Sequence, residues 1–200
     1  MSPDPTRSRE RERVEDRTKP PATGQGYLSR LAPEFYRGRA FVHWTLTVQN
    51  RATGWLNPTF SHAWQLTLLH VCSRFALVCP AYVLMPDHLH LLLLGLNETG
   101  SDQRTAIEFL RKQLRDVLAP VDWQRQAHDH VLREKEREHD AFRTVAHYIF
   151  ENPVRAGLID AWGEYPYTGC CVAGYPALDV RAVGYWELFW RIYGRLITSA

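Results

Sequence analysis

The fold of this chain is decided by the stretch Leu77-Val-Cys-Pro-Ala-Tyr-Val-Leu-Met85-Pro86-Asp87-His88-Leu-His90-Leu-Leu-Leu-Leu94. Aliphatic, aromatic and β-branched residues dominate both halves, which predicts two strands, at 77–85 and 88–94. Pro86 and Asp87 are typical of a tight turn between two strands. The stretch therefore predicts a β-hairpin.

The other elements are predicted from apolar periodicity and from helix start and stop signals. A strand is expected at 41–49, and helices at 61–75, from Ser101 or Asp102 to Pro120, at 140–152 and at 185–197. The segment 123–133 is ambiguous, and 157–181 is loop-rich. This order favours an α+β fold, a ferredoxin-like antiparallel sheet with helices packed mainly on one face.

The length of 200 residues fits one domain with tails, and a hydrophobic content of 45% is enough for a buried core. Residues 1–26 interleave basic and acidic residues and are nearly devoid of apolar ones, which predicts a disordered charged tail, either solubilising or touching DNA. Residues 27–172 form the predicted domain. Residues 173–200 form a C-terminal extension that we expect to be helical.

The formal net charge is only +2, so affinity for nucleic acid would have to come from local clusters of Arg and Lys. The second predicted helix carries four cations largely outside its apolar stripe: Arg104, Arg111, Lys112 and Arg115. This surface is either an ordinary solvated helix face or one that follows phosphates.

The four cysteines include no Cys-x-x-Cys pair and two are adjacent, which argues against structural zinc and against a disulfide scaffold. Free thiols suit a reducing compartment. The first 20 residues lack the apolar segment of a signal peptide, and no apolar run reaches the ~20 residues that span a bilayer. We therefore expect a cytoplasmic protein without a membrane partner.

His88 and His90 are two residues apart on a predicted strand, so both imidazoles project from one face. That spacing suits two ligands of one divalent metal, while Leu89 points to the other face. The alternative is a pair of half-exposed polar residues, and a second His-x-His, His128 and His130, illustrates how easily the pattern arises. The strongly apolar strand favours a functional pair, because unpaired buried polar groups cost about 1–3 kcal/mol each.

Tyr148 and Asn152 are four residues apart on a predicted helix and therefore share one helix face. A phenol there can act as a nucleophile, and a carboxamide oxygen can bind a hard metal. The alternative is an ordinary amphipathic tyrosine beside a helix C-terminus.

The two segments together, Met85-Pro-Asp-His-Leu-His-Leu-Leu-Leu93 and His147-Tyr-Ile-Phe-Glu-Asn-Pro-Val-Arg-Ala-Gly-Leu158, resemble the repeat-associated tyrosine transposases. These belong to the HUH single-strand endonuclease group and are relatives of small insertion-sequence transposases. Trp123-Gln124 and Asp129-His130-Val-Leu-Arg133 also resemble the family segment before its tyrosine helix. The resemblance covers about residues 37–170. It fails at 164–171, where relatives commonly have a Trp-Pro-x-Ser-Ser segment.

The resemblance implies a role for each matching residue. Tyr148 corresponds to the catalytic nucleophile, and His88, His90 and Asn152 correspond to ligands of Mg²⁺ or Mn²⁺. His130 matches a recurrent histidine that would support the active site, and Arg155 joins the helical cations as a DNA-binding candidate. Four aromatic residues are candidates for base stacking, with core packing as the alternative for each: Trp44, Trp55, Tyr82 and Trp123.

The implied activity is a metal-dependent cut in single-stranded DNA at hairpins or palindromic repeats, through a 5′-phosphotyrosine link and a free 3′-OH. The enzyme would be a bacterial monomer or homodimer, associated with the nucleoid when bound. Two other functions stay open: a catalytically inactive regulator that binds hairpin DNA, and a metal-dependent phosphodiesterase without a covalent intermediate.

Overall fold

The computed structural model describes residues 30–199, so the predicted tail at 1–26 lies outside the described residues. Five strands form one antiparallel sheet in the order β4-β1-β3-β2-β5. The strands are β1 Phe41–Thr47, β2 Leu77–Leu84, β3 His88–Gly95, β4 His128–Val131 and β5 Thr168–Cys171. The α-helices are α1 Pro58–Arg74, α2 Gln103–Gln113, α3 Arg115–Leu118, α4 Glu134–Arg137, α5 His139–Phe150, α6 Asn152–Arg155 and α7 Tyr185–Thr198. Short 3₁₀ helices are η1 Pro33–Tyr36, η2 Gln49–Arg51 and η3 Trp162–Glu164.

The first six major elements follow the order β1-α1-β2-β3-α2-β4, which is the ferredoxin-like arrangement expected from the sequence. The predicted hairpin is confirmed: β2 and β3 pair antiparallel, and the Met85 amide donates to the His88 carbonyl at 2.8 Å. The ambiguous segment provides β4 on one edge of the sheet. The loop-rich segment contains β5, a strand that the sequence did not predict, on the other edge.

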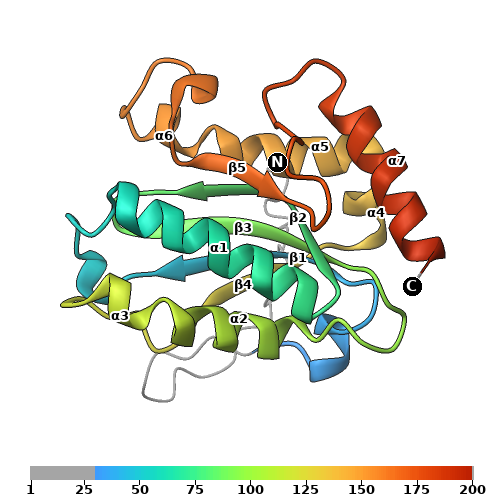
Figure 1. Ribbon diagram of the computed structural model, residues 1–200, viewed down its shortest axis with the longest axis horizontal. Helices are drawn as coiled ribbons and strands as arrows, with labels where there is room; N and C mark the ends of the chain where they lie inside the picture. The colour runs from blue at the N-terminus through green and yellow to red at the C-terminus, as the bar shows by residue number, and fades with distance from the viewer. Residues whose placement is uncertain (1–29, 200) are drawn as a thin grey trace, which may run out of the picture.

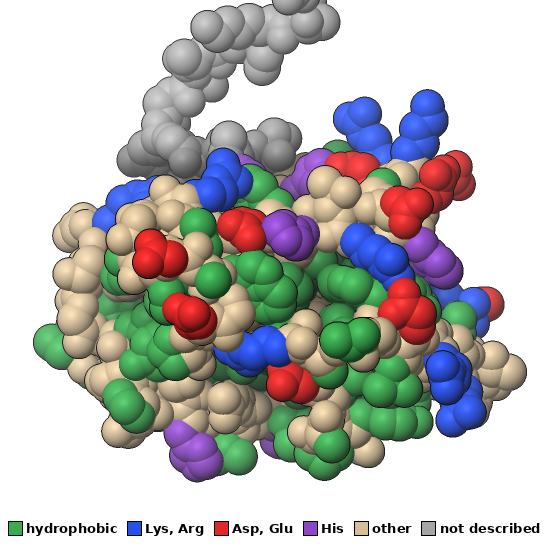
Figure 2. All heavy atoms as spheres, turned by 90° about the horizontal axis from the view of Figure 1, so that it is seen from above, with side chains coloured by type: hydrophobic (Ala, Val, Ile, Leu, Met, Phe, Trp, Pro, Cys, Tyr) green, Lys and Arg blue, Asp and Glu red, His purple; other side chains and the backbone are tan. Residues whose placement is uncertain are grey.

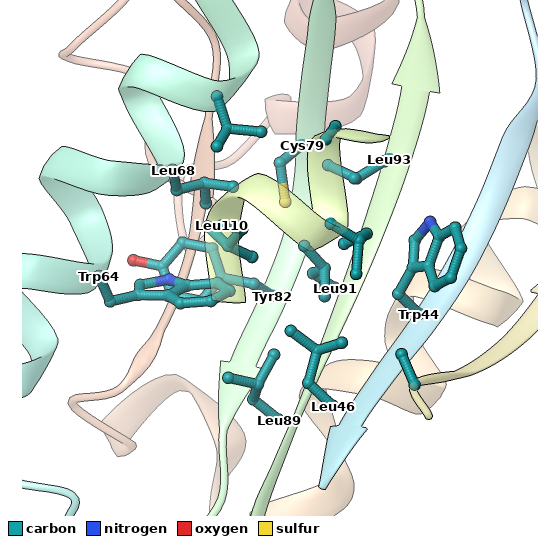
Figure 3. Packing of buried hydrophobic residues seen from close by; sticks show 14 of the residues in the cluster. Trp44, Leu46, Trp64, Leu68, Cys79, Tyr82, Leu89, Leu91, Leu93 and Leu110 are labelled. Carbon is teal, nitrogen blue, oxygen red and sulfur yellow. The ribbon is translucent and has the colours of Figure 1, made fainter. Parts of the chain in front are cut away.

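One face of the sheet is covered by α1 and α2. Figure 3 shows Leu89, Leu91 and Leu93 of β3 lying among side chains from these helices, such as Leu68 and Leu110. All five are fully buried. The four candidate stacking aromatics are also buried, with 0–6% of each side chain exposed (Trp44, Trp55, Tyr82 and Trp123). They are core residues, so the stacking prediction is wrong for them.

The opposite face is covered as well, by α5 and α7, which corrects the expectation of helices mainly on one face. Figure 1 shows these helices together, apart from α1 and α2. Phe142 of α5 and Phe189 of α7 are fully buried against strand residues such as Leu92. The predicted C-terminal helix is thus confirmed. Its tyrosines also anchor it to the sheet, since the Tyr185 hydroxyl donates to the Pro80 carbonyl at 2.6 Å.

Two helix boundaries, the start of α1 and the end of α5, differ from the prediction. Asn57, not Ser61, caps α1, because its side chain accepts from the Phe60 amide at 3.0 Å and Pro58 fits the first turn. The helix α5 ends at Phe150, and Pro153 then lies in the first turn of α6 instead of ending the helical path. Among residues 30–199, no helix has both the length and the apolar character to cross a bilayer.

Candidate active site

Three neighbouring strands bring histidines together on the sheet face that faces α5. In register, His43 of β1 is opposite His130 of β4, and Thr45 is opposite both His90 of β3 and His128 of β4. Directly opposed residues of an antiparallel pair project from the same face, so these side chains share one surface. His88, two residues from His90, projects from this face too.

His88 and His90 come together as the two-residue spacing predicts. Their Nε2 atoms are 3.1 Å apart, and Leu89 between them is fully buried in the core on the other face. The strand thus fixes both imidazoles through a side chain that is anchored on the opposite side. The backbone of β3 is also held in place, because β3 pairs with a neighbouring strand on each side.

The outer nitrogen of His88 is held by Asp87, the residue before it in the hairpin turn. The Asp87 Oδ1 to His88 Nδ1 distance is 2.6 Å, and Arg51 forms an ion pair with the same carboxylate at 2.7 Å. A carboxylate at Nδ1 accepts a hydrogen bond from the ring N–H and so leaves the Nε2 lone pair directed toward His90. Such a carboxylate–histidine pair is typical of metal-binding histidines.

The outer nitrogen of His90 has two neighbours. Its Nδ1 lies 3.0 Å from the Thr45 hydroxyl and 3.1 Å from His43 Nε2. Burial, together with the neighbouring imidazoles, lowers the pKa of His90 to about 3 and that of His43 to about 4. Both rings are therefore neutral near pH 7, which is the protonation state that a metal ligand requires.

The separation of the His88 and His90 Nε2 atoms suits two ligands of one divalent cation. Two nitrogens that each lie about 2.1 Å from one cation at right angles are about 3 Å apart, close to the separation found here. Within residues 30–199, however, no three His, Cys, Asp or Glu side chains gather in a metal-holding group. A third protein ligand would have to be of another type.

Tyr148 lies on α5, the helix that covers this face. Its side chain is 46% exposed, and its ring is edge-on to the His43 ring with centroids 6.5 Å apart. The buried positions of α5, Phe142 and Ile149 among them, fix the helix against the sheet and leave Tyr148 at the margin. The Arg155 guanidinium lies over the tyrosine ring, 4.5 Å from its centroid, and puts a positive charge beside the phenol.

Asn152 begins α6 directly after α5. Its Nδ2 donates hydrogen bonds to the Tyr148 and Ile149 carbonyls at 2.8 and 3.2 Å. The Oδ1 atom is the side-chain atom that could coordinate a metal. No hydrogen bond joins Asn152 to either histidine in the described part of the chain. The structure thus brings Asn152 to the backbone of Tyr148, and brings Tyr148 to the histidine face through His43.

His130 lies at the edge of the same face. Its Nε2 is 2.8 Å from the Glu136 carboxylate, and its side chain is half exposed. The contact ties β4 to α4, the short helix before the tyrosine helix. His130 therefore adjoins His43 across the strand pair, without a contact to the His88 and His90 pair.

The helical cations lie on the other side of the sheet, because α2 packs against the opposite face. Arg104 lies over the Tyr36 ring at 5.8 Å, Arg111 donates to the Gln124 carbonyl, and Arg115 approaches Asp122 at 3.8 Å. Lys112 is exposed. Figure 2 shows Lys and Arg intermingled with Asp and Glu on the face that it draws, in keeping with the small net charge.

Sequence reasoning missed the contacts around the pair, namely Thr45 and His43 beside His90, and Asp87 and Arg51 beside His88. One signal was available for Asp87, since it directly precedes His88 in the turn. For His43 and Thr45 the signal was their two-residue spacing along β1, which places both side chains on one face. Only the pairing of β1 with β3 relates them to His90.

Comparison with known proteins supports the resemblance found in the motifs. No family model matches the chain. A curated protein of Haemophilus influenzae, described as a REP-associated tyrosine transposase, is 22% identical over 157 residues, which are 70% of this chain and 85% of that protein.

Among solved structures, a REP-associated tyrosine transposase bound to a REP hairpin matches with a TM-score of 0.60 and 20% identity, over 72% of this chain and 82% of that chain. A bacterial tRNA(His) guanylyltransferase-like protein in complex with GTP reaches a TM-score of only 0.37 at 11% identity, over 60% and 68% of the two chains, which is too low to relate the folds. The resemblance to REP-associated tyrosine transposases is thus confirmed in sequence and in fold.

Proposed function

We propose that this chain is a metal-dependent single-strand DNA endonuclease and strand transferase that cuts at or near DNA hairpins, with Tyr148 as its nucleophile. The observation that carries the proposal is the joint geometry of His88, His90 and Tyr148. The two facing Nε2 atoms are 3.1 Å apart, and the tyrosine lies on the helix covering the same sheet face. The similarity to REP-associated tyrosine transposases supports it.

In this proposal His88 and His90 hold Mg²⁺ or Mn²⁺, and the Asn152 Oδ1 atom is the third protein ligand. The cation would polarise the scissile phosphate and offset its developing negative charge. Asp87 and Thr45 keep the two imidazoles oriented with Nε2 inward. A site with mixed nitrogen and oxygen ligands accepts Mn²⁺ more readily than a site with only carboxylate ligands does.

Tyr148 performs the covalent step. Its phenol oxygen gives up its proton and attacks the phosphorus, the P–O3′ bond breaks, and the leaving oxygen takes up a proton to become a 3′-OH. The 5′-phosphate stays on the tyrosine until another 3′-OH attacks it and restores the phenol. Arg155 beside the ring is positioned to contact the phosphate, and its charge favours an anionic group there.

Hairpin DNA is the proposed substrate, since the solved relative is bound to a REP hairpin. The cations of α2 and α3 lie on the opposite sheet face from Tyr148. If they bind DNA, they contact a part of the hairpin away from the cut: Arg104, Arg111, Lys112 and Arg115.

The test uses hairpin oligonucleotides that carry either a 3′ or a 5′ label. With Mn²⁺ or Mg²⁺, the 3′ label should stay with the protein on a denaturing gel, and the 5′ label should leave as a shorter strand. Tyr148→Phe should abolish the adduct, whereas Tyr175→Phe, a control tyrosine beside β5, should retain it.

The two other functions give different results in the same assay. A regulator would bind the hairpin and leave both labels uncut. A phosphodiesterase without a covalent intermediate would release both labels, and its activity would survive Tyr148→Phe. Either result would contradict the proposal.

A further inference from the structure

Three of the four cysteines, Cys72, Cys79 and Cys171, meet in the core cluster beneath α1, on the side of the sheet away from the histidine pair, whereas Cys170 packs against the cluster on the opposite face. Cys72 is in the last turns of α1, Cys79 is in β2, and Cys170 and Cys171 end β5. These elements are far apart in sequence and become neighbours because β5 pairs with β2 at the sheet edge and α1 crosses both.

Cys171 has two buried thiols next to it. Cys79 is its partner in the β2–β5 register, and the Cys72 sulfur lies 3.9 Å from the Cys171 carbonyl oxygen. The two differ in their hydrogen bonds. The Cys79 thiol donates to the Ala81 carbonyl at 3.4 Å, whereas the Cys72 thiol donates to the Cys171 backbone carbonyl. Cys72 is therefore the thiol engaged with Cys171.

Cys171 also has access to solvent. It lines a cavity of about 570 Å³ with Leu69, Tyr82 and Tyr175, while Cys72 is 1% exposed. A hydrogen bond from Cys72 lowers the pKa of the Cys171 thiol against the opposing effect of burial. Its neighbour Cys170 lines the same cavity, but burial raises the pKa of that thiol to about 11. The thiolate is the reactive form, so adjacent cysteines differ in reactivity.

We propose that Cys171 is a modification site that reacts with peroxide and is then joined by Cys72 in a disulfide between β5 and α1. The Cys171 sulfur attacks the peroxide, an S–O bond forms, the O–O bond breaks, and water leaves to give a sulfenic acid. The Cys72 thiol attacks that sulfur, the S–O bond breaks, and a second water leaves with the Cys72 proton. Two thiols are oxidised and one hydrogen peroxide is reduced to two waters.

This proposal does not depend on the DNA-cutting function, since it concerns a different corner of the fold. Its consequence is a covalent tie between the edge strand and the last turns of α1. Thiol reductants reverse the reaction, because they reduce the disulfide back to two thiols.

Peptide mapping of the full-length protein tests the proposal without any variant. Trypsin separates the thiols, since residues 52–74 hold Cys72, residues 75–104 hold Cys79, and residues 156–181 hold Cys170 and Cys171. After treatment with hydrogen peroxide and digestion without reductant, we expect a disulfide-linked pair of peptides 52–74 and 156–181. A link between 75–104 and 156–181 in its place, or no loss of free thiols, would overturn the proposal.

Single variants identify the atoms involved. Cys171→Ser should abolish the link, Cys170→Ser should retain it, and Cys72→Ser should leave a sulfenic acid that dimedone traps. In the untreated protein, iodoacetamide at pH 7.5 should label Cys171 about tenfold faster than Cys170. Equal labelling of the two, or a link that persists in Cys171→Ser, would contradict the assignment.

Discussion

His43 Nε2 lies 3.1 Å from His90 Nδ1, across the pairing of β1 and β3. This contact joins the histidine pair to the tyrosine helix, because the His43 ring also meets the Tyr148 ring edge-on. One line of contacts therefore crosses the face: Arg51, Asp87, His88, His90, His43, Tyr148 and Arg155. Each residue in this line contacts the next, so a substitution at one should alter the orientation of its neighbours.

His43 should act as a positioning residue for His90. We expect His43→Ala to weaken Mn²⁺ binding at least about tenfold, since one of the groups that hold His90 Nδ1 is lost. His43→Gln can put an amide group near the former Nε2 position and should remain within a few-fold of the parent protein. Titration calorimetry measures both variants. Equal affinities for His43→Ala and the parent protein would remove His43 from this role.

Asp87 should orient His88 in the same way. Asp87→Ala removes the carboxylate at Nδ1 and should weaken Mn²⁺ binding by about 10–100-fold, with adduct formation restored at higher Mn²⁺ concentration. Arg51→Gln is the matched control, because it touches only the carboxylate and should have a smaller effect. If activity is lost in Asp87→Ala and no Mn²⁺ concentration restores it, the residue has another function.

The stability of the metal-free protein should fall as the pH is lowered from 7 to 5. Burial lowers the pKa of His90 to about 3 and that of His43 to about 4, from 6.5. Below pH 6.5 these two histidines become protonated in the unfolded chain but stay neutral in the folded protein. The free energy of unfolding therefore decreases by up to about 2 kcal/mol per histidine at pH 5.

Urea unfolding at pH 7, 6 and 5 measures this effect. Carboxyl groups with a lowered pKa, such as Glu136, affect stability mainly at lower pH and do not mask the effect of the histidines. His43→Gln should show a shallower dependence than the parent protein. A midpoint that stays constant from pH 7 to 5 would mean that neither histidine is buried in its neutral form.

The C-terminal helix should be part of the folded domain. Phe189 is fully buried against the sheet, whereas its neighbour Leu188 is 43% exposed. Phe189→Ala should therefore lower the free energy of unfolding by about 3–5 kcal/mol, and Leu188→Ala by well under half of that. Chemical denaturation of both variants checks this, and similar losses would indicate that α7 is not packed as described.

The hairpin and the orientation of His88 and His90 could be predicted because side chains alternate along a strand with a period of two. The partners of His90 could not, since His43 and Thr45 become its neighbours only through long-range pairing of β1 with β3. The strand β5 was missed for a similar reason. Its four residues, Thr168–Cys171, have no apolar alternation and are extended because they pair with β2.

The path of the tyrosine helix was predicted only in part. We expected the helix to end at Asn152, because proline disfavours helical structure in the residue before it, but α5 ends at Phe150 and Asn152 is itself helical in α6. Pro153 nevertheless fits the first turn of α6, where its missing amide proton is not needed. This added turn carries Arg155 back over the Tyr148 ring, a contact that the sequence alone did not reveal.

The role of Tyr148 as the nucleophile is tested most directly by the mass of the tryptic peptide 144–155, in which Tyr148 is the only tyrosine. Protein incubated with a hairpin oligonucleotide and Mn²⁺ is treated with nuclease, digested and analysed by tandem mass spectrometry. We predict a nucleotide 5′-phosphate on Tyr148, absent without metal and reduced in His88→Ala. A nucleotide on another residue, or cut DNA with an unmodified 144–155 peptide, would contradict it.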